Sequence, residues 1–148
     1  SMIAKCYSSE CGSTDDTAQL ASKMQLLTSS LKDALMTIKS QNTTTKVLVT
    51  GYYQLVPASA KSCDTLIGIS DQELLWLRQQ DDNLNTAIKS AVTSAKYGRF
   101  VQPDFTGHEL CTKDSWIQDL QQKTPFHPNK DGQKAIGQAV VTAYTADL

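Results

Sequence analysis

A histidine on a restricted loop is the residue of this sequence best suited to chemistry. His127 lies within residues 124–129, where Pro125 and Pro128 restrict the backbone on both sides of it. Asn129 suits the N-cap of a helix that follows the loop. A general base needs such fixed placement, because proton transfer depends first on hydrogen-bond geometry. Taken alone, however, a loop histidine between prolines is more often structural than catalytic.

Four cysteines bear on where the protein works: Cys6, Cys11, Cys63 and Cys111. Zinc sites usually contain CxxC or HxxxH spacing, and neither is present. Four cysteines allow three disulfide pairings, among which Cys6–Cys11 would close a short loop and Cys63–Cys111 a long one. Disulfides imply an oxidising compartment. The alternative is a cytosolic protein with four reduced, buried cysteines.

The composition indicates an ordinary globular domain. The 148 residues are 40% hydrophobic and 20% charged, which is enough for one domain with a real core. A net charge of −1 favours neither nucleic acid nor an anionic membrane surface. No apolar run approaches the roughly 18 residues that a membrane span needs.

Hydrophobic periodicity predicts three long helices and two short strands. The second helix begins with Ser70 and Glu73 at the spacing of a capping box, and Gly98 suits its C-terminal end. A loop is expected over 51–68, and a loop with a small helix over 104–122. The long elements are expected at 15–39 (helix), 46–50 (strand), 70–98 (helix), 99–102 (strand) and 130–146 (helix).

The order strand, helix, strand predicts a crossover unit with two parallel strands. Parallel sheets are buried and normally contain more strands than two. Two strands beside three long helices would leave an open sheet edge, which invites pairing with another chain. The pattern is typical of the second half of a doubly wound α/β domain.

Four blocks of sequence occur in a specific order: Val-Leu-Val-Thr-Gly-Tyr at 47–52, Ile-Ser-Asp through Asn at 69–85, Gly-His-Glu-Leu-Cys at 107–111 with Trp-Ile at 116–117, and Phe-His-Pro-Asn at 126–129 with Gly-Gln at 132–133. Together they resemble the SGNH/GDSL hydrolases, in particular the secreted actinobacterial-type esterases and lipases. The blocks resemble, in order, the fourth strand with its exit, the next helix, a loop, and the final block that carries the catalytic histidine.

The resemblance implies a three-layer α/β/α, flavodoxin-like SGNH fold with a parallel sheet. Residues 1–148 would form a single, partial domain, the C-terminal half, with the N-terminal strands missing. The cysteines match two of the three disulfides of that subgroup, which implies the pairs Cys6–Cys11 and Cys63–Cys111 and a secreted protein. The implied chemistry is hydrolysis of a carboxylic ester, such as a lipid or an acetylated sugar, with no metal or organic cofactor.

Two departures from the family matter. The Gly-Asp-Ser nucleophile block and the oxyanion-hole blocks are absent, as is a Gly-x-Ser-x-Gly elbow, and a histidine without its serine cannot carry out covalent acyl transfer. The serine would come from an N-terminal segment, a cleaved fragment or a second subunit that covers the open sheet edge. The family's aspartate three residues before the histidine is Thr124 here. The resemblance to members without that aspartate implies that the Thr124 carbonyl orients the His127 ring.

Other polar and aromatic residues have a structural and a functional interpretation. His108 and Glu109 either border a substrate cleft or hold the loop attached to Cys111, and we favour the second. Residues 81–82, both aspartates, are expected on a solvated helix face. Three aromatic side chains either line an acyl pocket or pack in the core: Tyr52, Trp116 and Phe126.

Two other functions compete with ester hydrolysis. A binding or interaction protein on a degenerate SGNH scaffold would cover its open sheet edge by dimerisation or strand exchange. An unrelated, disulfide-stabilised helical domain would lose at most stability when His127 is replaced.

Overall fold

The computed structural model describes residues 2–59 and 63–146, so residues 60–62 of the expected loop and residues 1 and 147–148 of the expected domain lie outside the described residues. The three long helices and both strands expected from the sequence are present. The structure also contains a short N-terminal helix and a 3-10 turn that the sequence patterns did not predict. The elements are α1 (Met2–Ser8), α2 (Thr14–Gln41), β1 (Leu48–Thr50), η1 (Asp64–Leu66), α3 (Asp71–Ala95), β2 (Arg99–Val101) and α4 (Lys130–Thr145).

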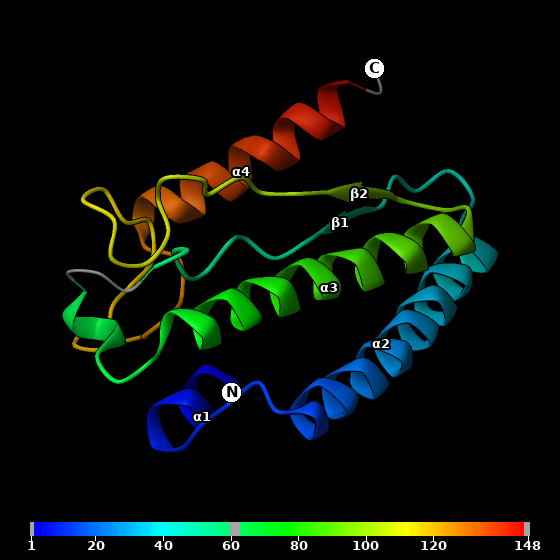
Figure 1. Cartoon of the computed structure of the whole chain (residues 1–148). Coiled ribbons are helices and arrows are strands. Elements are labelled where there is room, and N and C mark those ends of the chain that lie inside the picture. The colour runs from blue at the N-terminus through cyan, green and yellow to red at the C-terminus, as the bar shows by residue number, and fades with distance from the viewer. Residues whose placement is uncertain (1, 60–62, 147–148) are drawn as a thin grey trace.

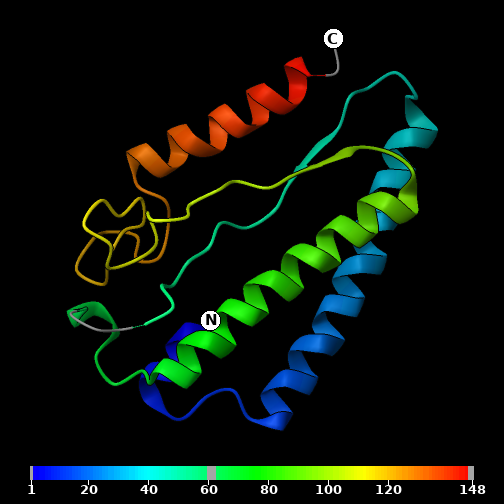
Figure 2. The same ribbon diagram turned by 45° about the horizontal axis from the view of Figure 1, so that its top comes forward.

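The two strands lie between α4 on one side and α3 with α2 on the other (Figure 1, Figure 2). They pair in parallel, with Val49 opposite Phe100, as the crossover through α3 predicts. The backbone N–H of Gly51 extends the pairing by donating to the Val101 carbonyl at 2.8 Å. Within the described ranges β1 pairs with β2 alone, so its other edge has no strand beside it. The open edge expected from the sequence is therefore present.

Side-chain caps explain where the helices begin. Ser13 begins α2 with a capping box closed by Asp16, and Ser70 begins α3 with the expected box closed by Glu73. The end of α3 differs from expectation, because Lys96 and not Gly98 takes the left-handed C-cap conformation, with φ of 48°. Gly98 has φ of 86° and turns the chain into β2 instead.

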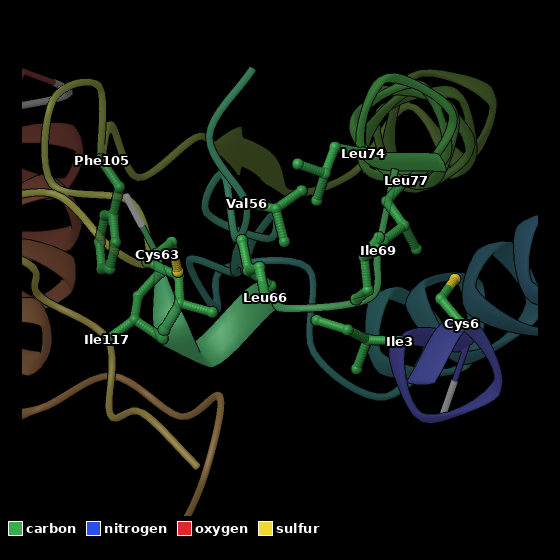
Figure 3. Close-up of a cluster of buried hydrophobic side chains, with 11 residues drawn as sticks. Ile3, Cys6, Val56, Cys63, Leu66, Ile69, Leu74, Leu77, Phe105 and Ile117 are labelled. Atoms are coloured by element: carbon green, nitrogen blue, oxygen red, sulfur yellow. The ribbon is translucent and has the colours of Figure 1, made fainter. Parts of the chain in front are cut away.

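Two hydrophobic clusters hold these elements together. The larger one joins α1, the turn η1, the start of α3 and the loop after β2, and it includes Val56, Leu66, Leu74 and Phe105 (Figure 3). The smaller one packs Leu35 of α2 against the end of α3 and the strands. Phe126, the neighbour of His127, also packs against the larger cluster, so the cluster supports the His127 loop.

Two disulfides reinforce the larger cluster. The structure joins Cys6 to Cys11 and Cys63 to Cys111, which is the pairing that the family resemblance implies. Described residues contain no free cysteine. The second bond spans 48 residues and ties the segment before α3 to the loop after β2. The loop is thereby fastened to the helical side of the molecule.

The prediction of a small helix within 104–122 is wrong. That segment forms successive turns, and Gly107 and Cys111 both have positive φ, at 82° and 71°. The side chain of Asp104 accepts the Thr106 N–H at 2.9 Å, which favours a turn at the start of the segment. Positive φ at Cys111 is incompatible with a right-handed helix through it.

Candidate functional site

A short antiparallel ladder fixes the backbone around His127. Ile117 and Pro128 form an isolated β-bridge. The Gln118 N–H donates to the His127 carbonyl at 2.8 Å, and the Asn129 N–H donates to the Trp116 carbonyl at 2.8 Å. The loop that holds His127 is thus tied to residues 116–118, which precede it by about ten positions.

The His127 ring is oriented by Pro125 and not by Thr124. Its Nδ1 lies 2.9 Å from the Pro125 carbonyl oxygen, whereas the Thr124 carbonyl accepts the backbone N–H of His127 at 3.3 Å. Proline at the second position and Phe126 with φ of 65° at the third are features of a type II turn. Such a turn uses the first carbonyl to close itself and leaves the second available to the ring. The expected role of the Thr124 carbonyl is therefore corrected to the Pro125 carbonyl.

This contact fixes the tautomer of a neutral His127 ring. A carbonyl oxygen can only accept, so Nδ1 must carry the proton that faces Pro125. The basic lone pair then belongs to Nε2. The side chain is exposed, so the ring is accessible to a reacting group. This arrangement suits a general base.

Gly132 allows helix α4 to approach the His127 loop closely. Asn129 caps this helix, as expected, by accepting from the N–H groups of Asp131 and Gly132 at 3.0 and 3.1 Å. A Cβ on Gly132 would lie 2.5 Å from the Trp116 carbonyl oxygen, which belongs to the ladder described above. Any larger side chain must therefore push the helix away from the loop.

We expect Gly132→Ala to lower the free energy of unfolding by about 1 to 3 kcal/mol, because the added methyl group overlaps backbone. The matched control is Gly137→Ala in the same helix, where a Cβ would meet nothing within 4 Å. That change should instead raise stability by about 0.5 to 1 kcal/mol through helix propensity. Urea denaturation of both variants measures the difference, and equal effects would contradict the close approach.

An apolar cavity of about 370 Å³ lies beside the site. Its walls come from α1, α2, α3, the segment that follows β1, and Phe126, the neighbour of His127. Tyr52 and Phe126 line this cavity, whereas Trp116 packs edge-on against Phe105 with ring centroids 5.3 Å apart. The lining consists mainly of apolar side chains: Ile3, Leu20, Met24, Leu27, Leu55, Val56, Leu77 and Leu84.

Asp81 is a half-buried carboxylate at the cavity wall. The prediction that it lies on a solvated helix face is therefore wrong. Its Oδ2 accepts the Leu55 N–H at 3.3 Å and the Gln54 amide at 3.2 Å. Burial raises the pKa of Asp81 to about 6, and nearby Asp82 adds to the rise; the Leu55 N–H and Arg78 oppose it. Its partners are 26 and 27 residues distant in sequence, so no local pattern reveals them.

We expect Asp81 to make stability fall with rising pH. The pKa is about 6 in the folded chain against an ordinary 3.8, so the folded state binds the proton more tightly. The stabilising contribution is present in full below about pH 4 and is lost as pH rises through about 6. As pH rises from 4 to 8, the free energy of unfolding of Asp81→Asn should therefore increase by on the order of 2 to 3 kcal/mol relative to that of the wild type. Urea denaturation at both values measures this, and a constant difference between the proteins would refute it.

His108 and Glu109 hold the loop near Cys111, as favoured from the sequence. The His108 ring stacks on Trp116 with centroids 3.6 Å apart, and its Nδ1 lies 2.8 Å from the Asp114 carbonyl. Glu109 is buried and accepts the Gly107 N–H at 2.9 Å. These contacts account for both side chains without a substrate.

Comparison with known proteins finds lipases of Streptomyces. Lipase 1 of Streptomyces coelicolor is 33% identical over 92 residues, which is 59% of this chain and 32% of that protein. Lipase 2 of the same organism is 29% identical over 126 residues, 80% of this chain and 41% of that protein. No protein-family profile matches the sequence. The chain thus spans well under half the length of these curated relatives.

Two solved structures share the fold. An extracellular lipase from Streptomyces rimosus superposes with a TM-score of 0.72 at 22% identity, over 93% of this chain and 62% of the lipase. Phospholipase A1 from Streptomyces albidoflavus superposes with a TM-score of 0.67 at 23% identity, over 96% of this chain and 61% of that enzyme. The α/β fold with a parallel sheet expected from the sequence is therefore confirmed: this chain is folded like about three fifths of these two enzymes.

Proposed function

We propose that this chain is the histidine-bearing part of a secreted serine ester hydrolase of the SGNH/GDSL type, with His127 as its general base. The observation that supports it most directly is the contact between Nδ1 of His127 and the Pro125 carbonyl, which leaves Nε2 basic on an exposed ring. Nε2 would take the proton of a serine hydroxyl as its oxygen attacks the ester carbonyl. It would then return that proton to the departing alcohol.

We also propose that the chain belongs to this family and forms a particular part of such an enzyme. The relatives are lipases and a phospholipase, which favours a lipid or another acyl ester as substrate. We infer that residues 1–148 form one partial domain, equivalent to the C-terminal half of such an enzyme. The serine and the oxyanion hole would then come from polypeptide outside these residues.

The open edge of β1 is the place where we propose that this additional polypeptide pairs. Val47 and Gly51 use their backbone groups toward β2, so those of Leu48 and Thr50 face the opposite edge. The apolar cavity begins at Tyr52 and Tyr53, directly beyond β1. A further strand on this edge would satisfy the backbone and bring apolar side chains toward the cavity. The serine-bearing segment, whether in the same chain or in a separate fragment, is the occupant that we propose.

Secretion is also part of the proposal. Both disulfides suit an oxidising compartment, and one of the relatives is an extracellular lipase. No helix within the described ranges combines the length and the apolar composition needed to cross a bilayer.

Hydrolysis of p-nitrophenyl acetate and butyrate tests the function. This chain alone, shown by intact mass to be free of other fragments, should show no hydrolysis above buffer. The same chain placed behind the serine-bearing segment of the Streptomyces rimosus lipase, or co-expressed with it, should hydrolyse both esters. A folded assembly without activity would favour the binding protein on a degenerate scaffold, and gel filtration of this chain would then show whether it self-associates.

A further inference from the structure

The peptide unit that leads into His127 is bound at both of its polar groups. The carbonyl oxygen of Phe126 accepts a hydrogen bond from the Tyr53 hydroxyl at 2.9 Å. The N–H of His127, in the same peptide unit, donates to the Thr124 carbonyl at 3.3 Å. A peptide plane held at both ends cannot rotate freely, so these two bonds, together with the ladder to residues 116–118, set the direction in which the His127 side chain leaves the backbone.

Tyr53 comes from a different part of the fold than the other groups that hold this turn. The bonds with Gln118 and with the Thr124 carbonyl are made within the one segment between β2 and α4, so they would move with that segment. Tyr53 follows β1 by three residues, and its bond to Phe126 spans 73 positions in sequence. It therefore connects the position of the His127 turn to the end of the sheet.

The Tyr53 side chain is itself well held. Its ring stacks on the buried Phe105 ring, with centroids 4.5 Å apart and planes 19° apart. Burial raises the pKa of Tyr53 to about 12, with smaller contributions from Tyr52 and Asp81. The hydroxyl consequently stays protonated, and able to donate, throughout the neutral range.

We propose that Tyr53 is a positioning residue that sets the orientation of the His127 imidazole through the Phe126 carbonyl. Its importance for catalysis rests on the proposed function. Its effect on the ring is a property of this chain alone and can be measured without any substrate.

The test is NMR of the two histidine rings in the ¹⁵N-labelled chain. Tyr53→Phe keeps the ring and its stacking on Phe105 but removes the hydroxyl, so the Nδ1 and Nε2 resonances of His127 should move toward each other as the tautomers mix. The His108 ring, which stacks on Trp116, should not change and reports that the fold persists. Tyr7→Phe is the matched control, because Tyr7 also stacks near Phe126 but donates its hydroxyl to the Thr65 carbonyl. It should leave the His127 resonances in place.

Unchanged His127 resonances in Tyr53→Phe, with or without a loss of thermal stability, would overturn the proposal. If that variant does not fold, Phe105→Leu, which loosens the Tyr53 ring and keeps its hydroxyl, should shift His127 in the same direction, and no shift there would also overturn it. In an active assembly Tyr53→Phe should lower kcat roughly tenfold, the size expected for one hydrogen bond, with KM nearly unchanged. Failure of all ester hydrolysis would count against the proposed function only, because the NMR result is independent of it.

Discussion

Replacing His127 with glutamine should reduce ester hydrolysis at least about a thousandfold in any active assembly that contains this chain. Glutamine keeps much of the polar surface and volume of the ring but cannot accept and return a proton at Nε2. The decrease should appear in kcat more than in KM, because the base acts in the transition state. Steady-state kinetics with p-nitrophenyl butyrate measures it.

The chain provides its own control for this prediction. His108 is the second of its two histidines, and its ring contacts are structural. His108→Gln should therefore retain kcat within a few-fold of wild type. Equal losses in the two variants would indicate damage to the loop, and full activity in His127→Gln would exclude the assigned base.

Removing the Cys63–Cys111 bond should cost about 4 kcal/mol in the free energy of unfolding, by chain entropy for its 48-residue separation. We expect the double variant Cys63→Ser, Cys111→Ser to melt on the order of 10 °C lower, since a domain of this size shifts by about 2 to 4 °C per kcal/mol. Differential scanning calorimetry under non-reducing conditions measures the shift.

The Cys6–Cys11 disulfide serves as the comparison for this prediction. Cys6 and Cys11 are five residues apart, so the same argument gives about 2 kcal/mol for removing their bond. Both pairs contribute buried or partly buried sulfur to the larger hydrophobic cluster, which makes the loss of packing similar. A larger destabilisation from Cys6→Ser, Cys11→Ser would show that loop length does not govern the difference.

The helices could be predicted from the sequence because their signals are local. Ser70 and Glu73 lie within one turn of each other, and the apolar stripe of α3 repeats along a single helix. The helix α1 has seven residues, no acidic residue in its first turn and no cap that the sequence makes evident. Its position depends on the bond from Cys6 to Cys11 and on a cluster that includes distant residues such as Leu66, so local patterns could not reveal it.

The same difference between local signals and long-range contacts applies to the candidate site. The helix cap Asn129 lies two residues after the candidate base His127, so this local feature could be predicted from the sequence. The sequence assigned the wrong carbonyl to the ring, because the choice between Thr124 and Pro125 depends on the turn type, and the turn type depends on φ at Phe126. Tyr53 could not be found at all, since its bond spans 73 residues.

The groups that hold His127 have a consequence for how such proteins diverge. The ring contacts the Pro125 carbonyl, and the backbone of the turn bonds to the backbones of Thr124 and Gln118, so the acceptors are all main-chain atoms. Main-chain acceptors persist when side chains are exchanged, provided that the turn keeps its shape. Selection on the histidine would then act on the backbone conformation of the turn, and on the Tyr53 hydroxyl that holds it, more than on the identity of the other neighbouring side chains. Side chains around the turn could then be exchanged over time without a change in the placement of the His127 ring.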